Sequence, residues 1–196
     1  KEELGGPKVC AEIAGTVHNL AKDDEEAISM ARRYLEYLPQ NRHAPAPRRE
    51  SDDTGPRSID EMLDLVPLDD RKPYKMSKVI ERLVDADSFF EIQPRYGRTL
   101  ITGLAFLGGQ SVAIVASEPW VRSGALDSAA AIKAMDFIEN ADHFNIPLVF
   151  LADNPGVLAG TRAEREGILK WGGKMFKAQQ RAKVPKLHVT FRKAFG

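Results

Sequence analysis

The chain has 196 residues, of which 43% are hydrophobic and 29% charged, as in ordinary proteins that bury a core. Its 28 basic residues balance its 28 acidic residues, so the net charge excludes a general attraction to nucleic acid. No stretch approaches the roughly 20 apolar residues that a membrane helix needs. The single cysteine, Cys10, cannot form an internal disulfide, which favours a reducing compartment such as the cytoplasm or the mitochondrial matrix.

The first predicted element is an amphipathic helix that follows Asp23 and Asp24 and ends at Pro39. Apolar residues recur along it with the helical period, and the acidic first turn complements the helix dipole. Residues 46–73 then change in character, because they are rich in proline and charge and poor in large apolar side chains. Such a stretch predicts a stiff, extended linker between a first segment, 1–45, and a second, 74–196.

Beyond the linker the pattern predicts an α/β domain. The expected elements are a helix near 76–84, a strand at 89–92, a hairpin of 99–107 and 111–117, a helix capped by Asp127, a buried strand at 147–152, a helix from 161 to about 183 and a strand at 186–191. This order favours helices that cover a largely parallel sheet.

The loop after the buried strand is the candidate ligand site. In open α/β folds, ligands bind beyond the carboxyl ends of the strands, where backbone amides point outward. The candidate residues are Asn154, Pro155, Gly156, Val157, Leu158, Gly160 and Thr161. Thr161 to Glu164 matches a capping box, and three glycines in the next helix (167, 172 and 173) predict close packing against another backbone. The same pattern also fits a tight turn that binds nothing.

Other kinds of site find little support. The four histidines have no metal-ligand spacing with one another or with Cys10, so no metal site is predicted. No nucleophile elbow is present, and Ser123 has no evident base beside it.

Three segments, taken together, resemble the carboxyltransferase β subunits of biotin-dependent acyl-CoA carboxylases, the family that acts on propionyl-, acetyl- and methylcrotonyl-CoA. The first runs from Glu3 to Pro39. The second includes Val66–Leu68, Pro73–Tyr74 and Phe89–Ile92. The third covers Phe144–Leu148, the candidate loop, Glu166–Ile168, Gly172 and Val184–Gly196.

The resemblance implies a crotonase-like α/β fold, with residues 1–45 as the end of an N domain and 74–196 as the first part of a C domain. It implies carboxyl transfer from carboxybiotin to the α-carbon of an acyl-CoA such as acetyl- or propionyl-CoA. Backbone amides stabilise two oxyanions, one on biotin and one on the thioester, and no metal takes part. The candidate loop then lies on the carboxybiotin side, and Gly196 lies at the edge of the biotin oxyanion hole.

The expected partners are a biotin carboxylase or biotin carboxyl carrier subunit and further copies of the same chain, paired as dimers within a hexamer. The chain starts at Lys1 without an initiating Met or an apolar signal core and stops at Gly196 directly after an apolar run, so both ends are expected to be internal cuts. The resemblance places the amides that hold the two oxyanions outside residues 1–196, so no catalytic set is complete and the isolated chain is expected to be inactive. Two alternatives stay open. One is a biotin-linked decarboxylase of malonyl- or methylmalonyl-CoA, and the other is a non-catalytic assembly module.

Overall fold

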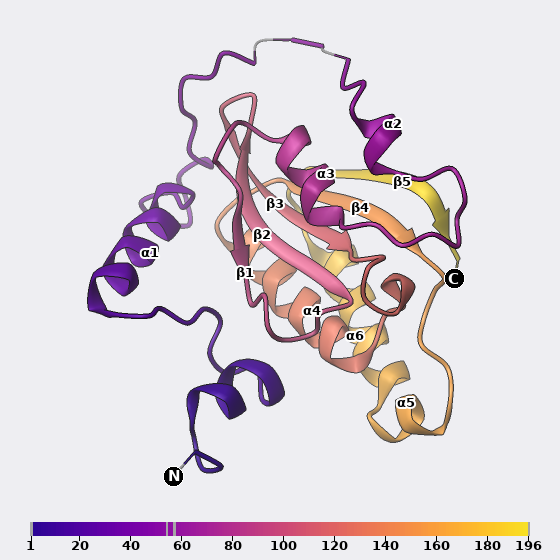
Figure 1. Ribbon diagram of the computed structural model, residues 1–196. Coiled ribbons are helices and arrows are strands. Elements are labelled where there is room, and N and C mark those ends of the chain that lie inside the picture. The colour runs from indigo at the N-terminus through magenta and orange to yellow at the C-terminus, as the bar shows by residue number, and fades with distance from the viewer. Residues whose placement is uncertain (1, 54, 57, 196) are drawn as a thin grey trace.

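The computed structural model describes residues 2–53, 55–56 and 58–195, and a single sheet organises them (Figure 1). Its strands within these residues are β1 (Phe90–Ile92), β2 (Leu100–Leu107), β3 (Gln110–Ser117), β4 (Leu148–Asn154) and β5 (Lys186–Ala194). The α-helices of the same residues are α1 (Asp24–Glu36), α2 (Met62–Leu65), α3 (Met76–Leu83), α4 (Ser128–His143), α5 (Thr161–Arg165) and α6 (Ile168–Arg181).

The sheet is mixed, with its strands in the spatial order β1-β2-β3-β4-β5. The pairs β1–β2 and β2–β3 are antiparallel, whereas β3–β4 and β4–β5 are parallel. The prediction of an α/β fold is confirmed, but the sheet is not largely parallel. The physical reason is the two-residue turn at Gly108 and Gly109, whose φ angles of 55° and 75° suit a tight hairpin and so force β2 and β3 to run in opposite directions.

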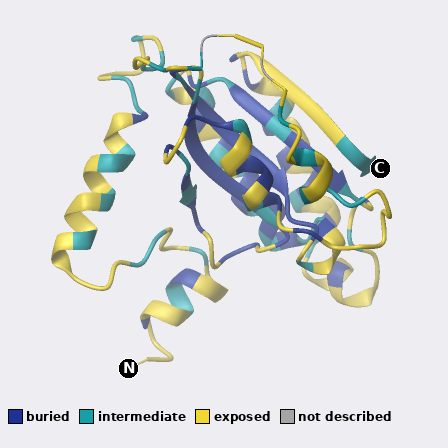
Figure 2. Cartoon of the chain, turned by 45° about the horizontal axis from the view of Figure 1, so that its top comes forward, coloured by how far each residue is buried: buried dark blue, intermediate teal, exposed yellow. Residues whose placement is uncertain are grey.

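Two apolar cores lie on opposite faces of this sheet. Helices α4 and α6 cover one face, where Ile138 and Met175 belong to the same buried cluster as Leu148. Helix α3 covers the other face through a second set of buried side chains that includes Met76, Val79, Ile80, Ile114 and Leu151. Figure 2 shows that the central strands are buried, while β5 at the edge of the sheet is largely exposed.

The segment before residue 45 packs on the β1–β2 side of the sheet. Tyr37 is 2% exposed, and its ring lies 5.0 Å from that of Phe106. Ser111 Oγ donates a hydrogen bond to the Tyr37 carbonyl at 2.9 Å. Helix α1 begins as predicted, because the Asp23 side chain accepts from the Glu26 N–H. The end of α1 is thus held by the same core that α4 and β2 build.

The helix expected over 161–183 is interrupted. Gly167 adopts a left-handed conformation with φ 76° and ψ 37°, which ends α5 and begins α6. The close packing expected at Gly172 and Gly173 is not found within the described residues, since a Cβ added at either position meets no atom within 4 Å. Among the described residues, neither glycine therefore makes a close contact that compensates for its weakening of α6.

Candidate functional site

A cavity of about 350 Å³ lies between α6 and the carboxyl ends of β3 and β4. Three of the predicted site residues line it: Asn154, Gly156 and Val157. The other four candidates in the loop, Pro155, Leu158, Gly160 and Thr161, do not line this cavity. Gly196 falls outside the described residues.

The walls of this cavity are mainly apolar. They come from β2, β3 and β4, from the segment after β3, from α6, and from β5 and the residue after it: Leu100, Val115, Ser117, Gly124, Leu126, Phe150, Leu151, Ala152, Met175, Phe176, Gln179, His188, Ala194 and Phe195. Val157, Phe176 and Phe195 are 41, 56 and 61% exposed, so the cavity opens to solvent along this rim. A pocket with apolar walls and few polar groups is typical of a site for a small organic ligand.

The loop is held in place by its own hydrogen bonds. Asn154 donates from Nδ2 to Ser117 Oγ at 3.2 Å and accepts from the Gly156 N–H at 3.0 Å. Leu126 forms a parallel bridge with Val157, in which the Leu126 N–H donates to the Gly156 carbonyl and the Leu158 N–H donates to the Leu126 carbonyl.

This bridge leaves one backbone donor free. Because residues 156 and 158 make both bonds to Leu126, the Val157 N–H points away from that segment. Among the described residues it has no hydrogen-bond partner. The Val157 N–H is therefore available to a ligand, whereas those of Gly156 and Leu158 are already occupied.

A strained turn supports the loop from the side of β3. Arg122, Ser123 and Gly124 are consecutive and all left-handed, with φ angles of 49°, 57° and 76°. A left-handed non-glycine residue costs on the order of 1 kcal/mol, and such strain gathers at functional sites. A Cβ added at Gly124 would lie 2.7 Å from the Asp153 carbonyl oxygen, so the turn packs against the end of β4 with no room for a side chain.

The predicted capping box at Thr161 is wrong. Thr161 is the first residue of α5, Gly160 is its N-cap, and no side chain makes a capping hydrogen bond there. Gly160 has φ 125° and ψ 164°, a conformation essentially restricted to glycine. The sharp entry into the helix therefore depends on the backbone of Gly160 and not on a hydroxyl group.

Glu118 is a buried carboxylate directly after β3, and it holds the start of the segment that leads to the strained turn. Its Oε1 accepts from the N–H groups of Trp120 and Met76 at 3.1 and 3.2 Å. Burial raises the pKa of Glu118, and these two N–H donors oppose that effect only in part.

We expect Glu118→Gln to stabilise the protein at neutral pH. The unfolded chain ionises at the ordinary carboxyl pKa of 4.5, whereas the folded protein holds its proton to a higher pH. Between these two pKa values the folded state binds more protons, so the wild-type free energy of unfolding falls as pH rises. Glutamine keeps the accepting oxygen and cannot ionise. Urea unfolding across the acidic to neutral range checks this, and identical pH profiles for the two proteins would contradict it.

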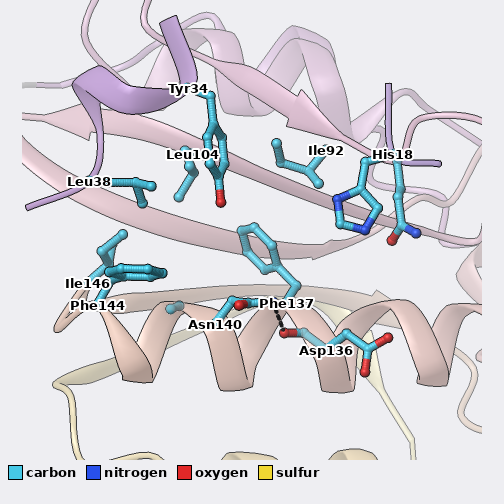
Figure 3. A pocket seen from close by; sticks show the side chains of 12 residues that line it. His18, Tyr34, Leu38, Ile92, Leu104, Asp136, Phe137, Asn140, Phe144 and Ile146 are labelled. Atoms are coloured by element: carbon cyan, nitrogen blue, oxygen red, sulfur yellow. Dashed lines mark hydrogen bonds between the residues drawn. The ribbon is translucent and has the colours of Figure 1, made fainter. Parts of the chain in front are cut away.

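A second cavity, of about 40 Å³, lies between α1, β1 and α4 (Figure 3). Tyr34 and Phe137 project into it from α1 and α4, and His18 and Asp136 lie at one side. Its volume is close to that of a single water molecule, so it cannot hold an organic substrate. It is a packing gap between the first segment and the sheet.

Two kinds of feature are absent from the described residues, 2–53, 55–56 and 58–195. No group of three or more His, Cys, Asp or Glu side chains is placed to hold a metal ion there. None of the helices in that part of the chain is long and apolar enough to cross a membrane.

Sequence reasoning missed the part of the site that precedes α4. Ser117, Gly124 and Leu126 line the cavity, and the first and last of these anchor the loop. Both strands were predicted, in a largely parallel sheet, but it was not predicted that β3 and β4 are neighbours in that sheet. That pairing brings the residues after β3 next to those after β4. A signal was present in the Ser123-Gly124 pair, because a Ser-Gly dipeptide is typical of a turn, and Gly124 has a positive φ in the structure.

The fold and the cavity define a class: an α/β protein with a ligand cavity beyond the carboxyl ends of parallel strands. A family model described as "Carboxyl transferase domain" matches residues 1–196. The chain therefore belongs to the carboxyl transferase domain family, and the resemblance noted in its sequence is confirmed.

Individual relatives agree with this assignment. Over 196 residues the chain is 44% identical to the protein named uncharacterized carboxylase YngE of Bacillus subtilis (strain 168) and 40% identical to the mitochondrial propionyl-CoA carboxylase beta chain of Homo sapiens. It covers 38% and 36% of their lengths, and all of it is aligned in both cases. The chain thus spans well under half of the relatives that it matches.

The solved structures give the same result. The crystal structure of transcarboxylase 12S, described as a hexamer with hydrolyzed methylmalonyl-coenzyme A bound, matches with a TM-score of 0.95 and 41% identity. The match covers the whole of this chain and 38% of that one. The expected crotonase-like fold is thereby confirmed.

Proposed function

We propose that this chain is the part of a carboxyltransferase that receives the carboxybiotin donor, within an enzyme that carboxylates the α-carbon of an acyl-CoA such as acetyl- or propionyl-CoA. The observation that carries this proposal is the cavity at the ends of β3 and β4, in a chain that matches the carboxyl transferase family from end to end. The names of the relatives, a propionyl-CoA carboxylase and a methylmalonyl-CoA carboxyltransferase, support this substrate class.

The residues around the cavity fit a biotin ring system. Leu126, Phe150 and Met175 offer apolar walls for a bicyclic ring, and the unpartnered Val157 N–H offers a donor for a ureido oxygen. The volume of about 350 Å³ lies at the lower end of the usual range for ligand pockets, about 300–1,000 Å³. These features support biotin as the cofactor, and the names of the relatives support a coenzyme A thioester as the substrate.

Biotin, when carboxylated and bound, supplies the activated carboxyl group. The chain contributes binding and orientation. The apolar walls exclude water, and the Asn154 side chain fixes Gly156 so that the Val157 N–H keeps one direction. A fixed backbone dipole needs no reorganisation when negative charge develops on a ligand oxygen, and one such donor is worth about 3 kcal/mol in comparable sites.

The test is to narrow the cavity at its rim in the intact enzyme. Val157→Trp places a large ring at the rim, and we expect it to raise the KM for the biotin carrier about tenfold or more, because small displacements of a bound reactant cost that much. The KM for the acyl-CoA should stay within about twofold, since the thioester is proposed to bind elsewhere. Carboxyl transfer from malonyl-CoA or methylmalonyl-CoA to a biotinylated carrier, followed by mass spectrometry of the carrier, measures both constants.

Ala159→Trp is the matched control. Ala159 is exposed, lies two residues further along the same loop and does not line the cavity. Equal effects of the two tryptophans, or no effect of Val157→Trp, would overturn the placement of biotin. Failure of the unmodified enzyme to label any carrier would overturn the proposed activity itself.

A biotin-linked decarboxylase is the second candidate, because a relative named methylmalonyl-CoA decarboxylase subunit alpha, from Veillonella parvula, is 39% identical over 195 residues. Addition of a second acyl-CoA after the carrier has been labelled separates the two functions. A carboxyltransferase passes the carboxyl group on to a second acyl-CoA, whereas a decarboxylase releases it as carbon dioxide.

We further propose the organisation of the whole enzyme. Residues 1–45 form the end of an N domain, 46–73 a linker and 74–196 the first part of a C domain, and residues 1–196 alone do not transfer carboxyl groups. The hexamer described for transcarboxylase 12S supports a homo-oligomer of paired chains, served by a biotin carboxylase or biotin carrier subunit. The mitochondrial and bacterial relatives support a place in the mitochondrial matrix or the bacterial cytoplasm.

A further inference from the structure

A buried ion pair lies on the other side of β4 from the cavity, one residue before Asn154. Asp153 is fully buried, and its Oδ2 accepts from Arg192 Nε at 2.7 Å and from the Tyr74 hydroxyl at 2.8 Å. Its second oxygen, Oδ1, is buried without a hydrogen-bond partner in the described part of the chain. Burying a carboxylate with one oxygen unbonded costs free energy, so this ion pair is not explained by a gain in folding stability. We therefore consider another role for it.

Arg192 also binds the end of the linker. Its guanidinium group stacks on the Tyr74 ring, with Cζ 4.7 Å from the ring centroid. Its Nη1 donates at 2.9–3.2 Å to three backbone carbonyl groups, those of Pro67, Asp69 and Lys72. The guanidinium group binds Asp153 through Nε and the three carbonyl groups through Nη1 at the same time, which the single nitrogen of a lysine ammonium group cannot reproduce.

The ion pair spans an irregularity in the sheet. Ala152 pairs with Thr190 and Asn154 pairs with Ala194, so three residues of β5 lie opposite the single residue Asp153. Bulges of this kind re-aim side chains and are common beside active sites. Here the bulge brings Arg192 to Asp153, and immediately beyond it the Phe195 N–H donates to the Asn154 carbonyl at 3.3 Å.

We propose that Arg192 is a positioning residue that couples the linker end, residues 67–72, to the cavity wall at 154–157. It fixes the direction in which the chain leaves β4 and so fixes Asn154, which in turn holds Gly156 and orients the Val157 N–H. The effect that we predict on the biotin donor rests on the proposed function, whereas the mechanical coupling itself does not.

The test is Arg192→Lys in the intact enzyme, because lysine keeps a charge beside Asp153 but has no second nitrogen to bind the three carbonyl groups at the same time. We expect the KM for the biotin carrier to rise about tenfold, with the KM for the acyl-CoA within about twofold. Hydrogen exchange is the second readout. The Leu158 amide, which donates to Leu126, should exchange at least about tenfold faster than in the wild type.

Lys193→Met is the matched control. Lys193 is the next residue on β5, and its Nζ donates to the Asp70 carbonyl at 2.8 Å, so it holds the same linker. Lys193 makes no ion pair with Asp153. Lys193→Met should therefore leave both the carrier KM and the exchange rate of the Leu158 amide unchanged. If Arg192→Lys does not fold, Tyr74→Phe, which removes one donor from Asp153, should accelerate Leu158 exchange in the same direction.

The outcomes separate the two proposals. Faster exchange confined to residues 67–73, or an equal rise in both KM values, would overturn the coupling. Faster exchange at Leu158 in an enzyme that transfers no carboxyl group would support the coupling and overturn the proposed function.

Discussion

Replacement of Lys133 by methionine is expected to lower the free energy of unfolding by about 3 kcal/mol or more. Lys133 lies on α4 and is 1% exposed. Its Nζ donates to the carbonyl groups of Gln93, Tyr96 and Leu100 at 3.0, 2.9 and 2.7 Å. Methionine fills a similar volume but donates nothing. The Tyr96 and Leu100 carbonyl groups lose this partner, the Gln93 carbonyl keeps only the Tyr96 N–H at 3.3 Å, and each buried polar group left unpaired costs about 1–3 kcal/mol.

Urea unfolding measures this loss, and Lys177→Met is the control. Lys177 is exposed on α6, so its replacement should change the free energy of unfolding by no more than about 0.5 kcal/mol. Equal stabilities of the two variants would show that the connection between β1 and β2 does not depend on the Lys133 ammonium group.

The wild type and the Lys133→Met variant also give a pH test. Burial lowers the pKa of Lys133 from 10.5 to about 8, although Glu91 and Asp127 act in the opposite direction. Between these values the unfolded chain binds more protons, so the contribution of Lys133 makes the protein more stable as pH rises from about 8 to 10.5. The variant lacks this contribution, and the difference between the two free energies of unfolding should therefore grow over that interval.

Lys133 illustrates what the sequence could not predict. Its neighbours on the buried face of α4, Ala130 and Ala134, follow the helical pattern, and a lysine between them indicates a solvent-exposed residue. Its role depends on carbonyl groups that lie 33–40 residues earlier in the chain. No local pattern contains that information, because it arises only when the loop before β2 packs on α4.

Elements set by local rules were predicted well. The Asp127 side chain caps α4 by accepting from the Ala130 N–H, and the glycine turn joins β2 to β3. Both signals lie within a few residues of the structure that they determine. The break at Gly167 was missed because an isolated glycine in a helical pattern is usually tolerated, and only its left-handed φ ends the helix here.

The candidate site was predicted in part for the same reason. A glycine-rich loop after a buried strand located Asn154, Gly156 and Val157, which do line the cavity. The pattern could not show which N–H groups remain free, since the bridge to Leu126 forms between segments about 30 residues apart in the chain. In the structure the Val157 N–H is free of hydrogen bonds to the described residues, whereas the loop sequence alone gave several N–H groups as candidate donors.

Gly124→Ala is expected to damage both the stability of the protein and the geometry of the site. The left-handed φ of 76° costs alanine on the order of 1 kcal/mol. The added Cβ also lies 2.7 Å from the Asp153 carbonyl oxygen, which is backbone and cannot turn aside as a side chain does. Overpacking of this kind costs about 1–3 kcal/mol, so the total loss should be about 3 kcal/mol.

Gly167→Ala separates the two causes, because Gly167 has the same φ of 76° but its added Cβ meets only the Trp171 side chain, at an ordinary 3.6 Å. It should therefore lose only about 1 kcal/mol, the cost of the dihedral angle alone. Urea unfolding compares the two variants, and equal losses would mean that the contact with Asp153 carries no strain. In the intact enzyme Gly124→Ala should also raise the carrier KM, because the displaced Asp153 carbonyl moves the adjoining Asn154, whereas Gly167→Ala should leave that KM unchanged.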